Sequence, residues 1–269
     1  MATYNVSTWD DFVTAFNAST GTTSDPDVIE IMTDLDVNTT PPTSQIRANA
    51  TKIINGNYHT IWNLAPGGIL GSAIISPNGN RTITWNKVNF NNIAFLENYA
   101  VFTSNSSYPM VFNDCTFVAK VASSLFAYAQ LNRCAVTMTG STNSHSPMSG
   151  VTANYSWLHY EHKRLNDNAS SEFAALNTCY IEGKITTTLS SANYPFQITG
   201  NPNSCVINID IDDPLQCSIS TGSSTVAVSV YNTDKIANYT GARTEIVGVT
   251  DTQLKDATYL ASVGFDIVT

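Results

Sequence analysis

The chain has 269 residues, which is long enough to bury a sizeable core, and all-β folds of this length often remain one domain. Its formal net charge of −9 argues against a nucleic-acid partner, because affinity for a phosphate backbone comes mainly from clustered Lys and Arg. Hydrophobic residues make up 42% of the chain and charged residues only 12%, a composition that excludes disorder and favours strands joined by polar turns.

Residues 1–20 predict a short amphipathic helix that caps one end of the fold. Thr8 precedes Trp9, Phe12 and Phe16, whose side chains fall on or near one helical face. Thr8 and Asp11 together resemble a capping box. Such a cap is needed if the fold is a solenoid of stacked coils, as the repeat described below predicts, because the terminal coil of a solenoid otherwise exposes open strand edges.

The N-terminal segment does not resemble a secretory signal, since no basic residue precedes Arg47 and no apolar core region is present. The longest apolar run, around Gly68 to Ile75, is broken by Gly and Ser and is too short for a membrane helix of about 20 residues. We therefore expect a chain that is made and kept soluble in a cytosol, with no membrane insertion.

Residues 25–245 predict short strands separated by turns rich in Asn, Gly and Pro. Apolar and polar side chains alternate along these segments, as is typical of β-strands with one buried face. Clear examples are Val28–Ile31, Arg81–Trp85, Cys205–Ile211 and Ser224–Val230.

An internal repeat with the pattern apolar-Asn-x-Cys-x-apolar runs through this region. Three copies fit it fully, and two partial copies either have Ile in place of Cys or lack the leading apolar residue. The copies are Phe90–Phe95, Phe112–Phe117, Leu131–Val136, Leu176–Ile181 and Asn203–Ile207. Their key positions lie 22, 19, 45 and 26 residues apart, and periods of about 20 to 25 are typical of solenoid coils. The sequence therefore predicts an all-β protein, a single-stranded right-handed parallel β-helix with short capping helices at both termini.

The key residue of each copy, and the residue two positions later, should point into the coil, because side chains alternate across a strand. Stacked coils would superimpose these residues as an interior ladder of Ile93, Cys115, Cys134, Cys179 and Cys205. The preceding Asn is expected at a turn, where it can bond the backbone of its own or the neighbouring coil and adopt a left-handed conformation.

The five cysteines include no Cys-x-x-Cys pair, so they indicate neither a closed set of disulfides nor a zinc site. We expect free buried thiols and no cofactor.

The interval between Cys134 and Cys179 is about twice the usual period, so it holds either two coils or one coil and an excursion. We expect an excursion loop near residues 141–172, because the segment 155–172 is the richest in charged and aromatic residues. Exposed Trp, Tyr and Arg side chains are favoured at contact surfaces. The partner-binding candidates are therefore Trp157, Tyr160, Lys163 and Arg164. A surface loop without a partner is the alternative.

The same segment contains His159 and His162, which a helix would bring about one turn apart. Their order does not match the His-Glu-x-x-His motif and no third ligand is evident, so we expect no metal site.

The densest acidic cluster, Asp210, Asp212 and Asp213, supplies the candidates for catalysis by paired carboxylates, as in polysaccharide hydrolysis. Alternation places Ile209 and Ile211 inside, so Asp210 and Asp212 would project outward together. A solvated strand end is the simpler interpretation, and we assign no catalytic residue.

Residues 250–269 predict a second helix and a tail. Thr250 and Gln253 fit a capping box, Leu254 and Leu260 follow at helical spacing, and Gly264 suits a helix stop. This helix would cap the stack or dock on a neighbouring subunit.

Several segments resemble pectin-lyase-like β-helix proteins, in which a short helix precedes a first coil of the type I-x-L-x-x-D-I and a second of the type I-x-G-N-x-H-T-I. The tail looks like the end of many phage and bacterial surface β-helices. The segments that carry the resemblance are Trp9–Phe12, Asp27–Ile31, Asp34–Val37, Ile54–Ile61 and Gln253–Ile267. The resemblance covers roughly the first 65 and the last 20 residues and is more specific for fold than for function, because this fold hosts many roles.

A surface-type β-helix without an export signal points to a bacteriophage virion, whose proteins assemble in the host bacterial cytoplasm, where unpaired cysteines are stable. We expect a non-enzymatic structural protein on the virion surface, in a tail, baseplate or head-decoration position. It would contact other virion proteins, form a homo-oligomer with a trimer favoured, and could touch a host surface glycan. The alternatives are a carbohydrate-binding or carbohydrate-cleaving tailspike and a bacterial surface adhesin.

Overall fold

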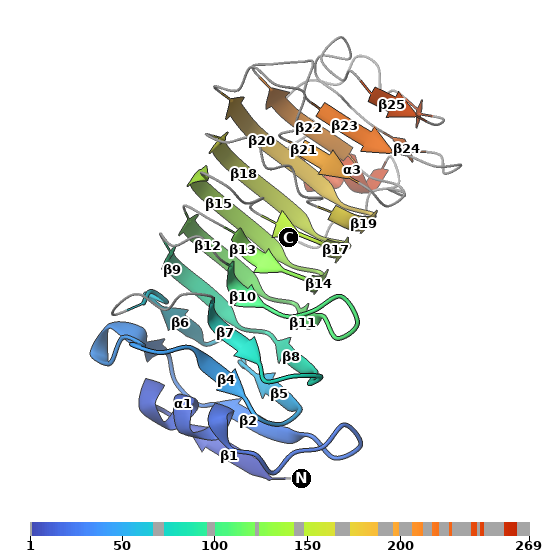
Figure 1. Ribbon diagram of the computed structural model, residues 1–269. Helices are drawn as coiled ribbons and strands as arrows, with labels where there is room; N and C mark the ends of the chain where they lie inside the picture. Colours follow the sequence, from blue (N-terminus) through green and yellow to red (C-terminus); the bar gives the residue numbers. More distant parts are fainter. Residues whose placement is uncertain are drawn as a thin grey trace.

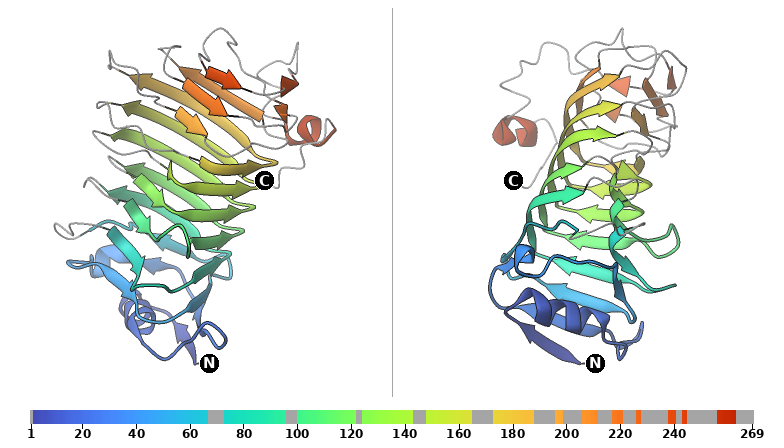
Figure 2. Two further views of the ribbon diagram at one scale, coloured as in Figure 1. Left: turned by 45° about the vertical axis from the view of Figure 1, so that its right-hand side comes forward. Right: turned by 60° about the vertical axis from the view of Figure 1, so that its left-hand side comes forward.

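The protein is a parallel β-solenoid in which each coil stacks on the next (Figure 1). The computed structural model describes residues 2–66, 73–95, 100–121, 124–142, 148–164, 173–187, 196–198, 206–211, 217–220, 226–227, 238–240, 243–244 and 256–262. All described pairs between named strands are parallel, and the stack is elongated in every view (Figure 2). The predicted solenoid fold is therefore confirmed.

Three long sheets run along the stack, and we call them sheets A, B and C. Sheet A contains, in spatial order, β1 (Thr3–Val6), β2 (Asp27–Ile31), β5 (Lys52–Asn55), β8 (Ile83–Asn86), β11 (Met110–Asn113), β14 (Ala129–Asn132), β17 (Val151–Asn154), β19 (Phe173–Asn177), β21 (Phe196–Ile198), β23 (Cys217–Ser220) and β25 (Asn238–Thr240). Sheet B contains β3 (Leu35–Asp36), β6 (Thr60–Trp62), β9 (Asn89–Phe95), β12 (Thr116–Val121), β15 (Ala135–Thr142), β18 (Trp157–Arg164), β20 (Tyr180–Thr187) and β22 (Val206–Ile211). Sheet C contains β4 (Ile46–Ala48), β7 (Ala73–Pro77), β10 (Ala100–Thr103), β13 (Ser124–Ala127) and β16 (Met148–Ser149). Two further strands, β24 (Val226–Ala227) and β26 (Arg243–Thr244), pair with each other.

The bend between sheets A and B is built by the Asn-x motif. Each strand of sheet A from β8 to β19 ends in Asn, and the next residue has a positive φ of 51° to 55°. The left-handed residues are Lys87, Asp114, Arg133, Tyr155 and Thr178. The repeat predicted the left-handed conformation at the Asn itself, and this prediction is wrong. The Asn is instead the last extended residue of its strand, because it pairs in register with the Asn of the neighbouring coil.

The asparagines at these bends form a continuous hydrogen-bonded ladder. The Nδ2 of each Asn donates to the Oδ1 of the Asn in the preceding coil, over distances of 2.7 to 3.0 Å. The rungs are Asn55, Asn86, Asn113, Asn132, Asn154 and Asn177. Asn55 donates in turn to Glu30 Oε1 at 2.7 Å, so the ladder ends on a carboxylate. Because each half-buried amide from Asn55 to Asn154 both donates and accepts, the ladder holds successive coils in one register.

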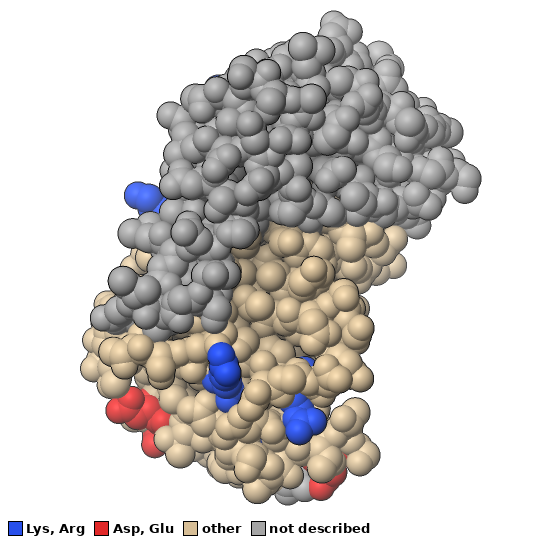
Figure 3. Space-filling model, in the orientation of Figure 1, with Lys and Arg blue, Asp and Glu red and all other residues tan. Residues whose placement is uncertain are grey.

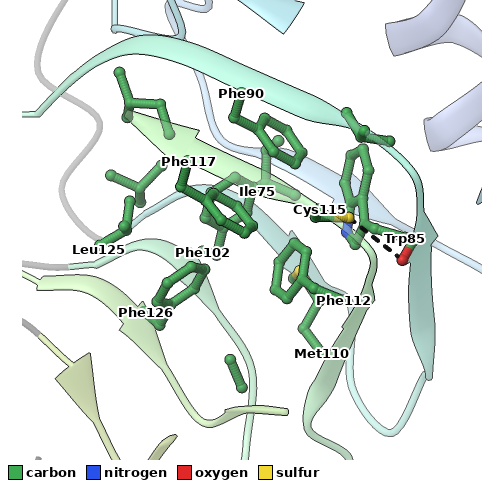
Figure 4. Packing of buried hydrophobic residues seen from close by; sticks show 14 of the residues in the cluster. Ile75, Trp85, Phe90, Phe102, Met110, Phe112, Cys115, Phe117, Leu125 and Phe126 are labelled. Atoms are coloured by element: carbon green, nitrogen blue, oxygen red, sulfur yellow. Dashed lines mark hydrogen bonds between the residues drawn. The ribbon is translucent and has the colours of Figure 1, made fainter. Parts of the chain in front are cut away.

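The interior is filled by columns of aromatic side chains that stack from coil to coil (Figure 4). Phe90 stacks on Phe117 with ring centroids 5.0 Å apart, and Phe102 stacks on Phe126 at 5.7 Å. Phe112 packs edge-on against Phe117 at 5.2 Å, which joins neighbouring columns. These rings are at most 1% exposed, and such burial of aromatic area dominates the energy of a core.

A second interior column contains the thiols. Cys115 and Cys134 are buried and free, as expected, and Cys179 is buried as well. Each Sγ lies 3.3 to 3.6 Å from two carbonyl oxygens, one two residues earlier and one in the preceding coil, and its single S–H can donate to either. Burial raises the pKa of the Cys115 thiol well above its ordinary value, so it stays protonated and can donate. Cys205 lies outside the described residues.

Ile93 does not belong to the thiol column, so this part of the predicted ladder is wrong. It is buried, but it pairs with Ala119 inside sheet B, next to a register irregularity. Val88 takes the position instead, because its carbonyl accepts from Thr116 N just as the Cys115 carbonyl accepts from Ala135 N. The true copy of the repeat therefore begins at Trp85 and not at Phe90.

The prediction of an excursion loop is also wrong for residues 148–164. These residues form β16, β17 and β18, and β18 pairs along its whole length with β15 and β20. The double interval therefore holds two coils. Ser156 replaces the cysteine in the extra coil: it is fully buried, its Oγ donates to Asn154 O at 2.9 Å and it accepts from Cys134 N at 3.1 Å.

The N-terminal helix α1 (Trp9–Asn17) closes one end of the stack, as predicted. Thr8 Oγ1 accepts the Asp11 amide at 3.1 Å, and this capping bond starts the helix. The helix buries Trp9, Phe12 and Phe16, and the Phe12 ring lies 5.7 Å from that of Trp85. The apolar face of α1 therefore continues the aromatic core.

Two other helical segments are short. A 3-10 turn, η1, spans Val37–Thr39. Helix α3 (Ala257–Ser262) lies within the predicted range 250–269, and Asp256 Oδ1 accepts the amides of Thr258 and Tyr259 at its start. The predicted capping box at Thr250 lies outside the described residues, and the capping role of this helix stays a prediction.

In the part of the chain that is described, no helix is both long and apolar enough to cross a membrane. On the face seen in Figure 3, the described atoms are mostly uncharged and the Lys, Arg, Asp and Glu side chains are scattered.

Candidate functional site

The outer face of sheet B carries a connected set of titratable and aromatic side chains. Alternate residues of β18 and β20 project from this face, since Leu158 and Ile181 between them are fully buried in the core. The register pairs Trp157 with Tyr180 and His159 with Glu182 on these neighbouring strands. We call the set Trp157, His159, Glu161, Tyr180 and Glu182 the sheet B cluster.

Glu182 is the centre of the sheet B cluster. Its Oε1 lies 3.1 Å from His159 Nδ1, and its Oε2 accepts the Tyr180 hydroxyl at 3.1 Å. The side chains of Tyr180 and Glu182 project from the outer face of the sheet. Even so, Tyr180 is only 1% exposed and Glu182 only 9%. A carboxylate so far removed from water is stable only when it is hydrogen-bonded, and these two bonds meet that need.

The carboxylate fixes the tautomer of His159. An ionised Glu182 can only accept hydrogen bonds, so His159 Nδ1 carries the proton and donates it. His159 Nε2 lies 4.0 Å from Glu161 Oε1. The ring is also stacked on Trp157, with centroids 5.9 Å apart. Such a held imidazole can accept a hydrogen bond or take up a proton.

The predicted acidic cluster is described only in part. Asp210 lies in β22 and pairs with Lys184 of β20, which places it on the same sheet as Glu182, near the sheet B cluster. Asp212 and Asp213 lie outside the described residues. The structure therefore brings one of the three acidic candidates to the sheet that carries the partner-binding candidates, which the sequence analysis had treated separately.

All four partner-binding candidates lie on one strand and not on a loop. Trp157, Tyr160, Lys163 and Arg164 belong to β18, and Trp157 is partly exposed beside His159. Lys163 pairs with Ser141 and Thr186. The expected contact with a partner stays a prediction.

The helical spacing considered for His159 and His162 is wrong, because both lie in β18. Residues three apart in a strand are about 10 Å apart along the chain, too far to share one ion without movement. Among the described residues, no group of three or more His, Cys, Asp or Glu side chains is arranged to hold a metal ion.

Tyr180 and Glu182 were not among the site residues predicted from the sequence. The only signal was the strand alternation Tyr180-Ile181-Glu182 after the Cys179 copy of the repeat, with Ile181 inside. That pattern places the two polar side chains on one face, but it does not say which other strand lies beside them.

No protein-family model and no curated protein matches the sequence. The fold is that of a parallel β-solenoid. The comparisons give no support for the more specific resemblance to pectin-lyase-like proteins.

Proposed function

We propose that this protein is a non-enzymatic structural protein on the surface of a bacteriophage virion, in a tail, baseplate or head-decoration position. The asparagine ladder supports this role most directly. It joins six successive coils by side-chain hydrogen bonds of 2.7 to 3.0 Å and ends on the carboxylate of Glu30. A stack tied by side-chain bonds from Glu30 to Asn177, with aromatic columns inside, suits a stiff element that keeps its shape under load.

The thiols support the proposed place of assembly. Cys115 and Cys134 are buried, free and hydrogen-bonded to carbonyl groups. Unpaired cysteines persist in a reducing compartment such as the host bacterial cytoplasm, where virions assemble. The partners in this proposal are other virion proteins and further copies of the chain, with a trimer favoured.

Immunogold electron microscopy of intact virus particles tests the location. An antibody against the folded chain should label the capsid or the tail of particles that carry the protein. Particles purified from the same lysate that contain the chain by mass spectrometry but show no surface label would contradict the proposal.

The sheet B cluster favours a second candidate function, the binding or cleavage of carbohydrate. Trp157 offers an aromatic platform, and His159 and Glu161 offer hydrogen-bond acceptors beside it. Sugars present hydroxyl donors and apolar ring faces, so this combination suits them.

Incubation with a panel of host capsular and cell-wall polysaccharides separates the two functions. The structural role predicts no release of reducing ends or unsaturated products. Release that is abolished by Glu182→Gln but retained by Lys120→Gln, a change on an exposed side chain of the same sheet, would establish cleavage and overturn the non-enzymatic role. Saturable binding without release would support the carbohydrate-binding form.

A further inference from the structure

A lysine and an aspartate face each other in the first coils, sealed from solvent. Asp27 of β2 and Lys52 of β5 are paired directly in register on neighbouring strands of sheet A. Lys52 Nζ lies 2.8 Å from Asp27 Oδ2, and both side chains are 0% exposed. Burying two charges in this way carries a large desolvation penalty before their attraction is counted, so the fold alone gives no reason to prefer this pair over apolar side chains.

The surroundings polarise the carboxyl group from several directions. The Ala2 amide donates to Oδ1 at 3.2 Å, and Thr20 Oγ1 donates to Oδ2 at 2.7 Å. The Tyr4 hydroxyl lies 3.2 Å from Thr20 Oγ1, and the Tyr4 ring centroid lies 5.7 Å from Lys52 Nζ. One oxygen thus has an amide donor, and the other has a hydroxyl pair that can pass a proton.

Gly21 closes the site over the aspartate. A Cβ atom at this position would lie 2.5 Å from the Asp27 amide nitrogen and 3.0 Å from Asp27 Cγ. Only glycine allows so close an approach of the loop, and this approach keeps water away from the pair.

The resting pair is ionic. Burial opposes the charge on Asp27, but the hydrogen bonds from Lys52, Thr20 and the Ala2 amide outweigh it and hold its pKa below the ordinary value. A reaction between the two groups therefore has to begin with proton transfer from Nζ to the carboxylate, across the 2.8 Å hydrogen bond.

We propose that Lys52 and Asp27 condense to an isopeptide bond that joins β5 to β2, its neighbour in sheet A. After proton transfer, the neutral Nζ attacks Asp27 Cγ, and the Ala2 amide stabilises the negative charge that develops on Oδ1. The C–Oδ2 bond then breaks. Oδ2 leaves as water with two of the three ammonium protons, one passed directly and one relayed by the Thr20 hydroxyl, and the third stays on the amide nitrogen.

The resulting bond would be a covalent staple at the end of the stack that α1 closes. It needs no oxidant, cofactor or second protein, because the condensation only releases water. It would form wherever the protein acts, so its test does not depend on the proposed virion role.

Intact-mass spectrometry of the purified, aged protein tests the proposal. The expected mass is lower than the sequence mass by one water molecule. Trypsin should then fail to cleave after the acylated Lys52, so that the peptide ending at Arg47 is recovered covalently joined to the peptide that runs to Arg81. Full sequence mass with normal cleavage after Lys52 would overturn the proposal, as would loss of water without the joined peptides.

Two variants serve as matched controls. Lys52→Arg keeps a cation beside Asp27 but should give the full sequence mass, because guanidinium is protonated too firmly to attack. Asp27→Asn removes the carboxylate that accepts the first proton from Nζ, so this variant should also give its full sequence mass, with normal cleavage after Lys52. Because the decisive measurement is made on the wild-type chain, poor folding of either variant leaves the proposal falsifiable.

Discussion

Removal of one rung from the asparagine ladder tests whether the ladder holds the coils together. Asn113 lies in the middle of the ladder: its Nδ2 donates to Asn86 Oδ1 at 2.8 Å, and its Oδ1 accepts from Asn132 Nδ2 at 2.7 Å. Asn113→Ala removes both bonds. The Oδ1 acceptor of Asn86 and the Nδ2 donor of Asn132 then lose their ladder partner.

The expected loss of stability follows from these two bonds. A typical hydrogen bond contributes about 0.5 to 1.5 kcal/mol net, and a polar group left unpaired in a buried site costs about 1 to 3 kcal/mol. Asn113 and its neighbours are half-buried, so water can replace part of what is lost. We therefore expect Asn113→Ala to lower the free energy of unfolding by about 2 kcal/mol, within the range for two net bonds.

Equilibrium unfolding in urea, followed by far-UV circular dichroism, measures this loss. Thr152→Ala is a suitable control, because Thr152 is half-buried on the outer face of sheet A but is not a rung of the ladder. Substitutions at such positions usually change stability by about 0.5 kcal/mol or less. Equal losses for the two variants would refute the structural role of the ladder.

Three further predictions concern the core and one ion pair. Phe117→Ala should destabilise the fold by about 3 to 5 kcal/mol, because it empties the stack on Phe90, and urea unfolding measures the loss. Cys134→Asp should aggregate or unfold the chain, whereas Cys134→Val should cost less than about 1.5 kcal/mol, and a soluble Asp variant on size-exclusion chromatography would place this thiol outside the interior. Hydrogen bonds from Arg133 hold the pKa of Asp114 below its ordinary value, so this stabilisation is present above the unfolded pKa of about 3.9 and is lost as pH falls through the lower folded pKa. Arg133→Gln should therefore flatten the acid side of a thermal-stability profile, and an unchanged acid side would contradict this assignment.

The repeat could be recognised where its key residue is a cysteine, because free cysteines are few and usually buried. It was missed at Ser156, where a hydroxyl makes the same hydrogen bond to the carbonyl two residues earlier as a thiol does. The repeat copy assigned to Ile93 was misplaced. The segment that starts at Phe90 has an Asn and apolar residues in the right order, but it lies in β9, whereas the true copy begins in β8. Residue type alone could not separate these cases.

The sheet B cluster, too, could be predicted from the sequence only in part. The concentration of Trp157, Tyr160, Lys163 and Arg164 in one segment was visible in the sequence, as was the outward alternation around Asp210. That His159 meets Glu182 was not visible, because the two residues are 23 positions apart and become neighbours only through the register of β18 and β20.

The parallel coil, the inward thiols and the N-terminal capping helix could be predicted from the chain alone, since each depends on local alternation, spacing or a capping residue. The number of coils between Cys134 and Cys179, the left-handed residue of each bend, and the side chains that meet on sheet B depend on contacts between coils. The physical reason is that successive rungs of the asparagine ladder are 31, 27, 19, 22 and 23 residues apart. With coils of unequal length, the register is set by contacts between coils and not by any fixed period along the chain.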